Sequence, residues 1–135
     1  MGGRDVRYAG GYAVAVGVLT LAQWGFFILG GRVPEFESEP IAIGFHLAAE
    51  ALMALALLVT GAALLRGRRG AVPFALVAYG MLLYTTVNSP GYFAQLGQWP
   101  LVLMFAVVLG LGVAAVARLV KVGGAAAARQ PAPRP

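Results

Sequence analysis

The chain has 135 residues, of which 60% are hydrophobic and only 11% are charged, and its mean hydropathy is +0.81. A soluble domain ordinarily has about a quarter of its residues charged and under half of them apolar. The composition therefore excludes a disordered chain, a nucleic-acid-binding domain and a typical soluble enzyme. It indicates an integral membrane protein that forms one compact unit.

Two residue types that commonly carry chemistry are scarce. The chain has no cysteine, which excludes disulfide relays, iron–sulfur clusters and thiolate metal sites. Its single histidine, His46, means that one chain cannot hold a haem between two histidines. The net charge of +5 does not indicate a nucleic-acid partner, because the basic residues stand at the ends of apolar segments, where membrane topology requires them.

Four apolar segments are long enough, or nearly so, to cross a hydrocarbon core of ~30 Å as helices. In chain order they cover residues 8–30, 41–65, 71–87 and 99–120. The third segment is short, and Pro90 either ends it or lies within a kinked continuation through residues 92–94. We therefore expect residues 1–122 to form one transmembrane unit and the low-complexity residues 123–135 to form a disordered cytoplasmic tail.

The distribution of basic residues predicts how the spans are oriented. Nine of the ten lie on one side of the predicted spans, and only Arg32 lies on the other, among three glutamates. The positive-inside rule then places both termini in the cytoplasm and the loops 31–40 and 88–98 outside. The nine residues are Arg4, Arg7, Arg66, Arg68, Arg69, Arg118, Lys121, Arg129 and Arg134.

The connections between the spans are short, which favours antiparallel neighbours. The expected fold is an all-α, up-down-up-down four-helix bundle in the membrane, with both termini cytoplasmic. Small residues at intervals of four allow membrane helices to approach closely. They are Ala9, Ala13 and Gly17 in the first span and Ala106, Gly110 and Ala114 in the fourth. This pattern predicts close packing, but the partner helix can belong to the same chain or to a second copy.

Glu50 is the polar residue that membrane insertion least favours. Counting from Ile41 at 1.5 Å per residue places it about 13–14 Å into the second span, near the midplane. An acidic residue there costs about 3 kcal/mol on insertion, and the apolar residues of the same span return about 3–6 kcal/mol. Acidic residues at such a depth usually face the bundle interior and mark a functional path.

His46 stands four residues before Glu50, so both project from one face of the helix. This spacing permits a hydrogen bond, direct or through water, and a proton that can sit on either group. The pair is therefore a candidate proton relay, with Glu50 as the acceptor. The alternative is that the two residues only fix packing. No residue is assigned as catalytic beyond this pair, and two ligands are too few for a metal site.

Further polar side chains occur at a similar depth. Gln23 lies about 10 Å below the outer end of the first span, and Tyr84 and Asn88 are four apart in the third, with Thr85 beside them. If the helices converge, one outward-opening pocket binds a ligand through Gln23, His46, Glu50, Tyr84 and Asn88. The alternative is that Tyr and Asn near a helix end are ordinary interfacial residues. Glu35, Glu37 and Glu39 either concentrate cations at the pocket mouth or form a solvated loop.

Several features of residues 44–120 occur together in one family. An acidic residue in the second span is followed by a leucine-rich run and a glycine (Glu50 to Gly61) and then by a short basic turn (Arg66 to Arg69). The next span opens Ala-Val-Pro and holds Met81, and an outer loop leads to Trp99-Pro100-Leu101. In these features the chain resembles the DoxX/DoxD-like family of small four-helix bacterial membrane proteins. The resemblance implies an inner-membrane subunit or partner of respiratory or redox enzymes that contacts a quinone, with Glu50 as the acid of the second span.

We therefore expect a small multi-pass membrane protein that has no catalytic activity of its own. Its pocket around Glu50 and His46 binds a quinone or a lipid, or relays protons, as an accessory subunit of a membrane redox complex. The expected partners are the lipid bilayer and a second copy or a larger membrane complex, and no cofactor is expected apart from a quinone. Two alternatives remain: a proton-coupled small-molecule exporter that works as a dimer, and an intramembrane acid–base enzyme that acts on a lipid.

Overall fold

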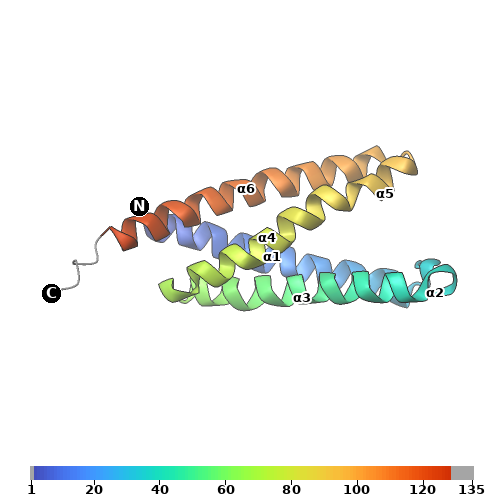
Figure 1. Ribbon diagram of the computed structural model, residues 1–135, viewed down its shortest axis with the longest axis horizontal. Coiled ribbons are helices and arrows are strands. Elements are labelled where there is room, and N and C mark those ends of the chain that lie inside the picture. Colours follow the sequence, from blue (N-terminus) through green and yellow to red (C-terminus); the bar gives the residue numbers. More distant parts are fainter. Residues whose placement is uncertain (1, 129–135) are drawn as a thin grey trace.

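The computed structural model describes residues 2–128, and this part of the chain is helical almost throughout. Its elements are α1 (Gly2–Leu29), α2 (Glu35–Ser38), α3 (Pro40–Leu65), the 3-10 turn η1 (Arg69–Ala71), α4 (Val72–Asn88), α5 (Pro90–Gln95) and α6 (Trp99–Ala127) (Figure 1). Four stretches are long and apolar enough to cross a membrane: Gly2–Leu29, Pro40–Leu65, Val72–Gln95 and Trp99–Ala125. The described chain is thus an all-α, multi-pass membrane protein.

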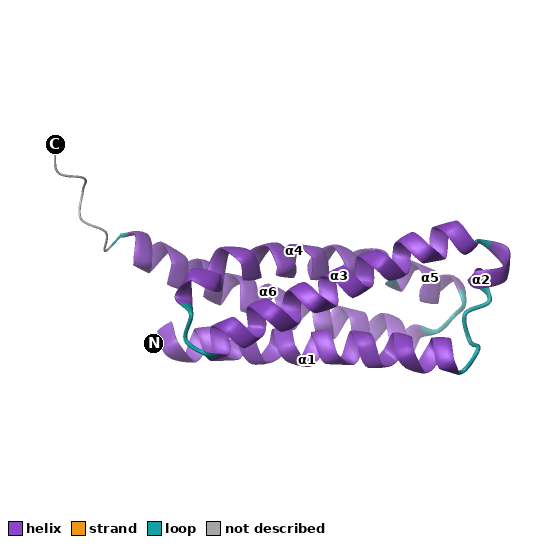
Figure 2. Ribbon diagram, turned by 90° about the horizontal axis from the view of Figure 1, so that it is seen from below, coloured by secondary structure: helices purple, strands orange, loops and turns teal. Residues whose placement is uncertain are grey.

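The four long helices lie side by side, and each packs mainly against two others. α1 packs against α3 and α6, and α4 packs against the same two helices. The start of α1, the turn between α3 and α4 and the end of α6 lie at one end of the molecule, whereas α2 and α5 lie at the other (Figure 1 and Figure 2). These are termed the basic end, which carries Arg4, Arg7, Arg66, Arg68, Arg118 and Lys121, and the acidic end, which carries Glu35, Glu37 and Glu39.

The third candidate span is built from two helices. α4 has 17 residues and is about 25 Å long, which is less than the thickness of a typical hydrocarbon core. Ser89 keeps a right-handed helical backbone (φ −66°, ψ −35°), and its N–H donates to the Thr85 carbonyl at 2.9 Å. Pro90 is tolerated because it lies in the first turn of α5, where its missing N–H would have no partner. The stretch Val72–Gln95 therefore extends to about 36 Å. This corresponds to the second of the two possibilities given above, in which the third span continues past Pro90.

The first and last helices are longer than the spans predicted from the sequence. α1 begins at Gly2 rather than near residue 8, and α6 continues to Ala127 rather than ending near residue 120. Residues 123–127, which were expected to belong to a disordered tail, are thus helical. Alanine is the strongest helix former, and the run of alanines after Gly123-Gly124 offsets the cost of the two glycines. Ala128 forms a turn, and the rest of the predicted tail, residues 129–135, lies outside the described residues.

Glycine ends α3 at a defined position. Gly67 has φ +77°, a left-handed conformation that other residues adopt only with strain. Its N–H donates to the Leu64 carbonyl at 2.9 Å, and the next N–H, of Arg68, donates to the Ala63 carbonyl at 3.0 Å. This pair of bonds is a Schellman motif, which satisfies the last carbonyls of the helix. The chain therefore turns sharply after α3, which leaves Arg66 at the basic end.

Glycines bring α1 and α3 into close contact. A Cβ atom placed on Gly61 would lie 2.8 Å from the backbone oxygen of Gly10, and one on Gly17 would lie 2.9 Å from that of Ala54. The small residues Ala9, Ala13 and Gly17 of α1 are all buried, as their spacing predicts. The second small-residue stripe is not buried along its length: Ala106 and Gly110 of α6 are exposed, and Ala114 is half-buried. A Cβ atom placed on Gly110 would meet nothing within 4 Å.

Three stacked tyrosines tie α1, α4 and α6 together. The ring centroids of Tyr8 and Tyr12 are 6.3 Å apart, and those of Tyr12 and Tyr79 are 6.2 Å apart. Tyr79 is fully buried and donates a hydrogen bond of 2.7 Å to the Ala9 carbonyl, and Tyr12 donates one of 2.6 Å to the Val108 carbonyl. Because each buried hydroxyl has a partner, these tyrosines contribute aromatic packing without leaving an unsatisfied polar group.

Candidate functional site

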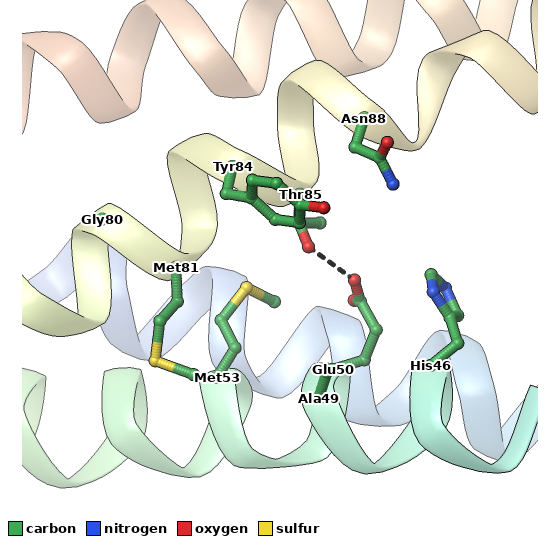
Figure 3. Close-up of a pocket in the computed structure, with 9 residues that line it drawn as sticks. All are labelled: His46, Ala49, Glu50, Met53, Gly80, Met81, Tyr84, Thr85 and Asn88. Carbon is green, nitrogen blue, oxygen red and sulfur yellow. Dashed lines mark hydrogen bonds between the residues drawn. The ribbon is translucent and has the colours of Figure 1, made fainter. Parts of the chain in front are cut away.

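A pocket of about 380 Å³ lies between α3 and α4 (Figure 3). It contains four of the five residues that were predicted to bind a ligand, namely His46, Glu50, Tyr84 and Asn88; Gln23 is not among its lining residues. The other lining residues are Ala49, Met53, Gly80, Met81 and Thr85. The pocket therefore combines one acid, one imidazole and two thioethers in a volume typical of small-molecule sites.

Glu50 lies on the buried face of α3 and points across the pocket towards α4 (Figure 3). It is only 7% exposed, and Met53, Ala54 and Leu57, three, four and seven residues further on, share its buried face. The packing of α3 therefore fixes the direction of the carboxylate. A helix that turned this face outwards would expose its apolar core residues together with the acid.

The Thr85 hydroxyl of α4 donates a hydrogen bond of 2.8 Å to Oε1 of Glu50. The other oxygen, Oε2, has no hydrogen bond within residues 2–128. No side-chain oxygen in this part of the chain is both fully enclosed and unpaired, so Oε2 retains access to the pocket. The carboxylate is thus anchored to α4 through one oxygen and can accept a hydrogen bond from a ligand at the other.

His46 also projects from α3 into the pocket, on the side of Glu50 nearer the acidic end (Figure 3). Within the described residues, no hydrogen bond joins His46 to Glu50, although their spacing permits one. The imidazole instead packs edge-on against Trp24 of α1, with ring centroids 5.7 Å apart and an interplanar angle of 73°. The tryptophan holds the ring in place, and the ring nitrogens remain available to a ligand or to water.

The two predicted ligand-binding residues of α4 lie at the open side of the pocket. Tyr84 is 71% exposed, and Asn88 is also exposed. Gly80 and Ala49, which also line the pocket, are exposed as well, and both lie well inside their helices. The open side of the pocket therefore faces the surroundings of the helices rather than only the end of the molecule.

Gln23 is exposed on α1 and takes no part in the pocket. The reason is the rotation of α1, whose small residues up to Gly17 face α3. Six further residues at about 100° each place Gln23 about 120° away from that face. The small-residue stripe could have predicted this rotation, because the stripe and Gln23 lie on different faces of α1 and cannot both face the centre of the bundle.

The acidic end carries one contact that the sequence did not indicate. The Tyr92 hydroxyl of α5 donates a hydrogen bond of 2.9 Å to the Glu35 carboxylate of α2, whereas Glu37 and Glu39 are exposed. This bond connects the loop before α3 to the end of the third span. Within residues 2–128, no three His, Asp or Glu side chains come close enough together to hold a metal ion.

Comparison with known proteins assigns the chain to a family. Residues 4–130 match the model of the family described as "Domain of unknown function (DUF8058)", and the chain belongs to that family. No curated protein and no solved structure matches it. Nothing in these findings links the chain to the DoxX/DoxD-like family, so that resemblance stays a prediction.

Proposed function

We propose that the pocket between α3 and α4 binds the polar head of a small lipid-soluble molecule of the quinone class. The observation that carries the proposal is Glu50, a carboxylate that is almost wholly buried, held at one oxygen by Thr85, and open to the pocket at the other. A buried acceptor without its full set of hydrogen bonds favours a ligand that donates one. A quinol hydroxyl is such a donor.

The walls of the pocket favour an apolar ring. Met53 and Met81 line it together with Glu50, and thioethers pack well against aromatic rings at about 5 Å. The exposed residues at its open side, Ala49, Gly80 and Tyr84, lie within helices that are long and apolar enough to span a membrane. A ligand would therefore enter from the lipid, which favours an amphiphile over a water-soluble substrate.

We infer a proton-linked role from the same group. In an up-down-up-down bundle with both termini in the cytoplasm, Glu50 lies in the outer half of its span, and His46 lies between it and the acidic end. When the partner redox complex takes the electrons of the bound quinol, Glu50 would accept a proton that the quinol releases, and His46 would pass that proton towards the outer surface. The protein would act in this way as an accessory subunit of a redox complex in the inner membrane, and it would supply the site without itself carrying out the redox chemistry.

Replacing Glu50 by Gln tests the proposed function. The amide keeps the shape of the side chain but removes the charge that strengthens the hydrogen bond to a ligand hydroxyl, so we expect the affinity to fall about tenfold or more. Purified protein that carries Trp99→Phe, which leaves Trp24 as its one tryptophan, is titrated with a short-chain quinol in mild detergent. Binding is followed by the fluorescence of Trp24, which packs against His46 at the pocket.

Glu37→Gln is the matched control, because it makes the same chemical change on the exposed surface of α2. It should bind the quinol as the unmodified protein does. Equal affinities in all three proteins would remove Glu50 from the binding site and would overturn the proposal.

A further inference from the structure

A second pocket lies at the basic end, between the start of α1 and the end of α3. Its volume is about 420 Å³, and it is lined by Gly2, Gly3, Val6, Arg7, Leu64, Leu65, Arg66 and Gly67. Arg7 and Arg66, both exposed, line the same cavity, and no acidic residue lines it. Val6 and the two leucines supply an apolar wall. This combination differs from a simple row of basic residues along a helix end.

The fold fixes the backbone positions of the two arginines. Gly10 and Gly61 bring the backbones of α1 and α3 into close contact within about two turns of Arg7 and Arg66. The Schellman motif at Gly67 then turns the chain directly after Arg66. The separation of the two arginine backbones is thus set by packed elements, and only the side chains must order when a ligand binds.

We propose that this pocket binds the phosphate group of an anionic phospholipid. A guanidinium group offers a planar fork of donors that matches phosphate oxygens, and two such groups share one phosphodiester. A free phosphate would make no use of the apolar wall, whereas the glycerol and the first acyl carbons of a lipid would cover it. Basic pockets between membrane helices on the cytoplasmic side are suited to lipid headgroups.

This site is independent of the proposed function of Glu50. Leu64 and Glu50 are 14 residues apart in α3, which corresponds to about 21 Å along the helix. The two pockets share no lining residue. A failure of one proposal therefore leaves the other unaffected.

A pair of double variants with the same change in charge tests the proposal. Arg7→Gln with Arg66→Gln removes both arginines of the pocket. Arg4→Gln with Arg68→Gln removes two exposed arginines from the same end of the molecule that do not line it. Each full-length protein in mild detergent is titrated with phosphatidylglycerol, phosphatidylcholine and inorganic phosphate, and the thermal unfolding midpoint is followed.

Phosphatidylglycerol should raise the midpoint of the unmodified protein and of the Arg4/Arg68 variant at the same concentrations, and the two other compounds should have little effect. The Arg7/Arg66 variant should need about tenfold more phosphatidylglycerol or more, because it loses two charge-assisted contacts. A milder variant, Arg7→Lys with Arg66→Lys, keeps the charge without the planar fork and should fall between them. The proposal is overturned if both glutamine variants weaken equally, if the unmodified protein gains nothing, or if inorganic phosphate acts as well as the lipid.

Discussion

Glu50 and Thr85 show how far single residues could be interpreted from the sequence. Glu50 was identifiable from the sequence because inserting an acidic residue inside an apolar span costs free energy, and such residues usually have a functional role. Its hydrogen-bond partner, Thr85, was not identifiable from the sequence. A threonine hydroxyl in a helix commonly donates to a carbonyl of its own helix, as those of Thr60 and Thr86 do here at 2.6 Å and 3.0 Å. Only the rotation of α4 against α3 distinguishes Thr85 from these two.

Replacing Thr85 by Val removes the hydroxyl with little change of shape. Oε1 of Glu50 then loses its only donor within the described chain, so we expect the unfolding free energy to fall by about 1–2 kcal/mol. Thr85→Ser keeps the hydroxyl and should retain most of the stability. Reversible unfolding in mixed micelles measures both variants, and a Val variant as stable as the Ser variant would show that the hydrogen bond contributes nothing.

The packing of the helices was partly predictable at the scale of the elements. Hydropathy located the four spans, since a bilayer requires long apolar helices whatever their packing. The stripe of Ala9, Ala13 and Gly17 indicated a close contact of α1, whereas in the similar stripe of α6 Ala106 and Gly110 are exposed. Composition cannot distinguish the two, because nearly every face of a membrane helix is apolar. The continuation of α4 into α5 depends in the same way on the backbone of Ser89, which the sequence leaves open.

Gly61→Ala tests the contact between α1 and α3. The added Cβ would lie 2.8 Å from the Gly10 oxygen and 3.0 Å from the Ala13 Cβ, so the helices must separate. We expect a loss of about 1–3 kcal/mol in the unfolding free energy. Gly110→Ala is the control, because its Cβ meets nothing within 4 Å, and it should be neutral or more stable by up to about 1 kcal/mol. Unfolding in mixed micelles compares the two, and equal effects would contradict the close contact.

The separation of basic and acidic residues is a property of the whole molecule. The sequence predicted which loops share a side, and in the described part of the chain the elements that carry the basic residues and the three glutamates lie at opposite ends of the molecule (Figure 1). Which end faces the cytoplasm is a proposal that rests on the positive-inside rule. The two pockets could not be found from the sequence as volumes, because each requires the relative placement of two helices. Arg7 and Arg66 are 59 positions apart in the chain and line one cavity.

Single cysteines test the orientation directly, because the chain has none of its own. Ser38→Cys labels the acidic end and Gly70→Cys labels the basic end, and both positions are exposed. In intact cells, an impermeant maleimide should react with Cys at position 38 at once and with Cys at position 70 only after the membrane is opened. The reverse pattern, or labelling of both in intact cells, would contradict the proposed orientation.

The ligand of the Glu50 pocket can be measured without assuming its identity. The protein and its Glu50→Gln variant are extracted in the mildest detergent that keeps them folded and are analysed by native mass spectrometry, with Glu37→Gln as the control. We predict that the unmodified protein and the control retain a small lipid-soluble molecule with the mass of a quinone, and that the Glu50→Gln variant has lost it. Retention of the same molecule by all three proteins, or its absence from all three, would contradict the account.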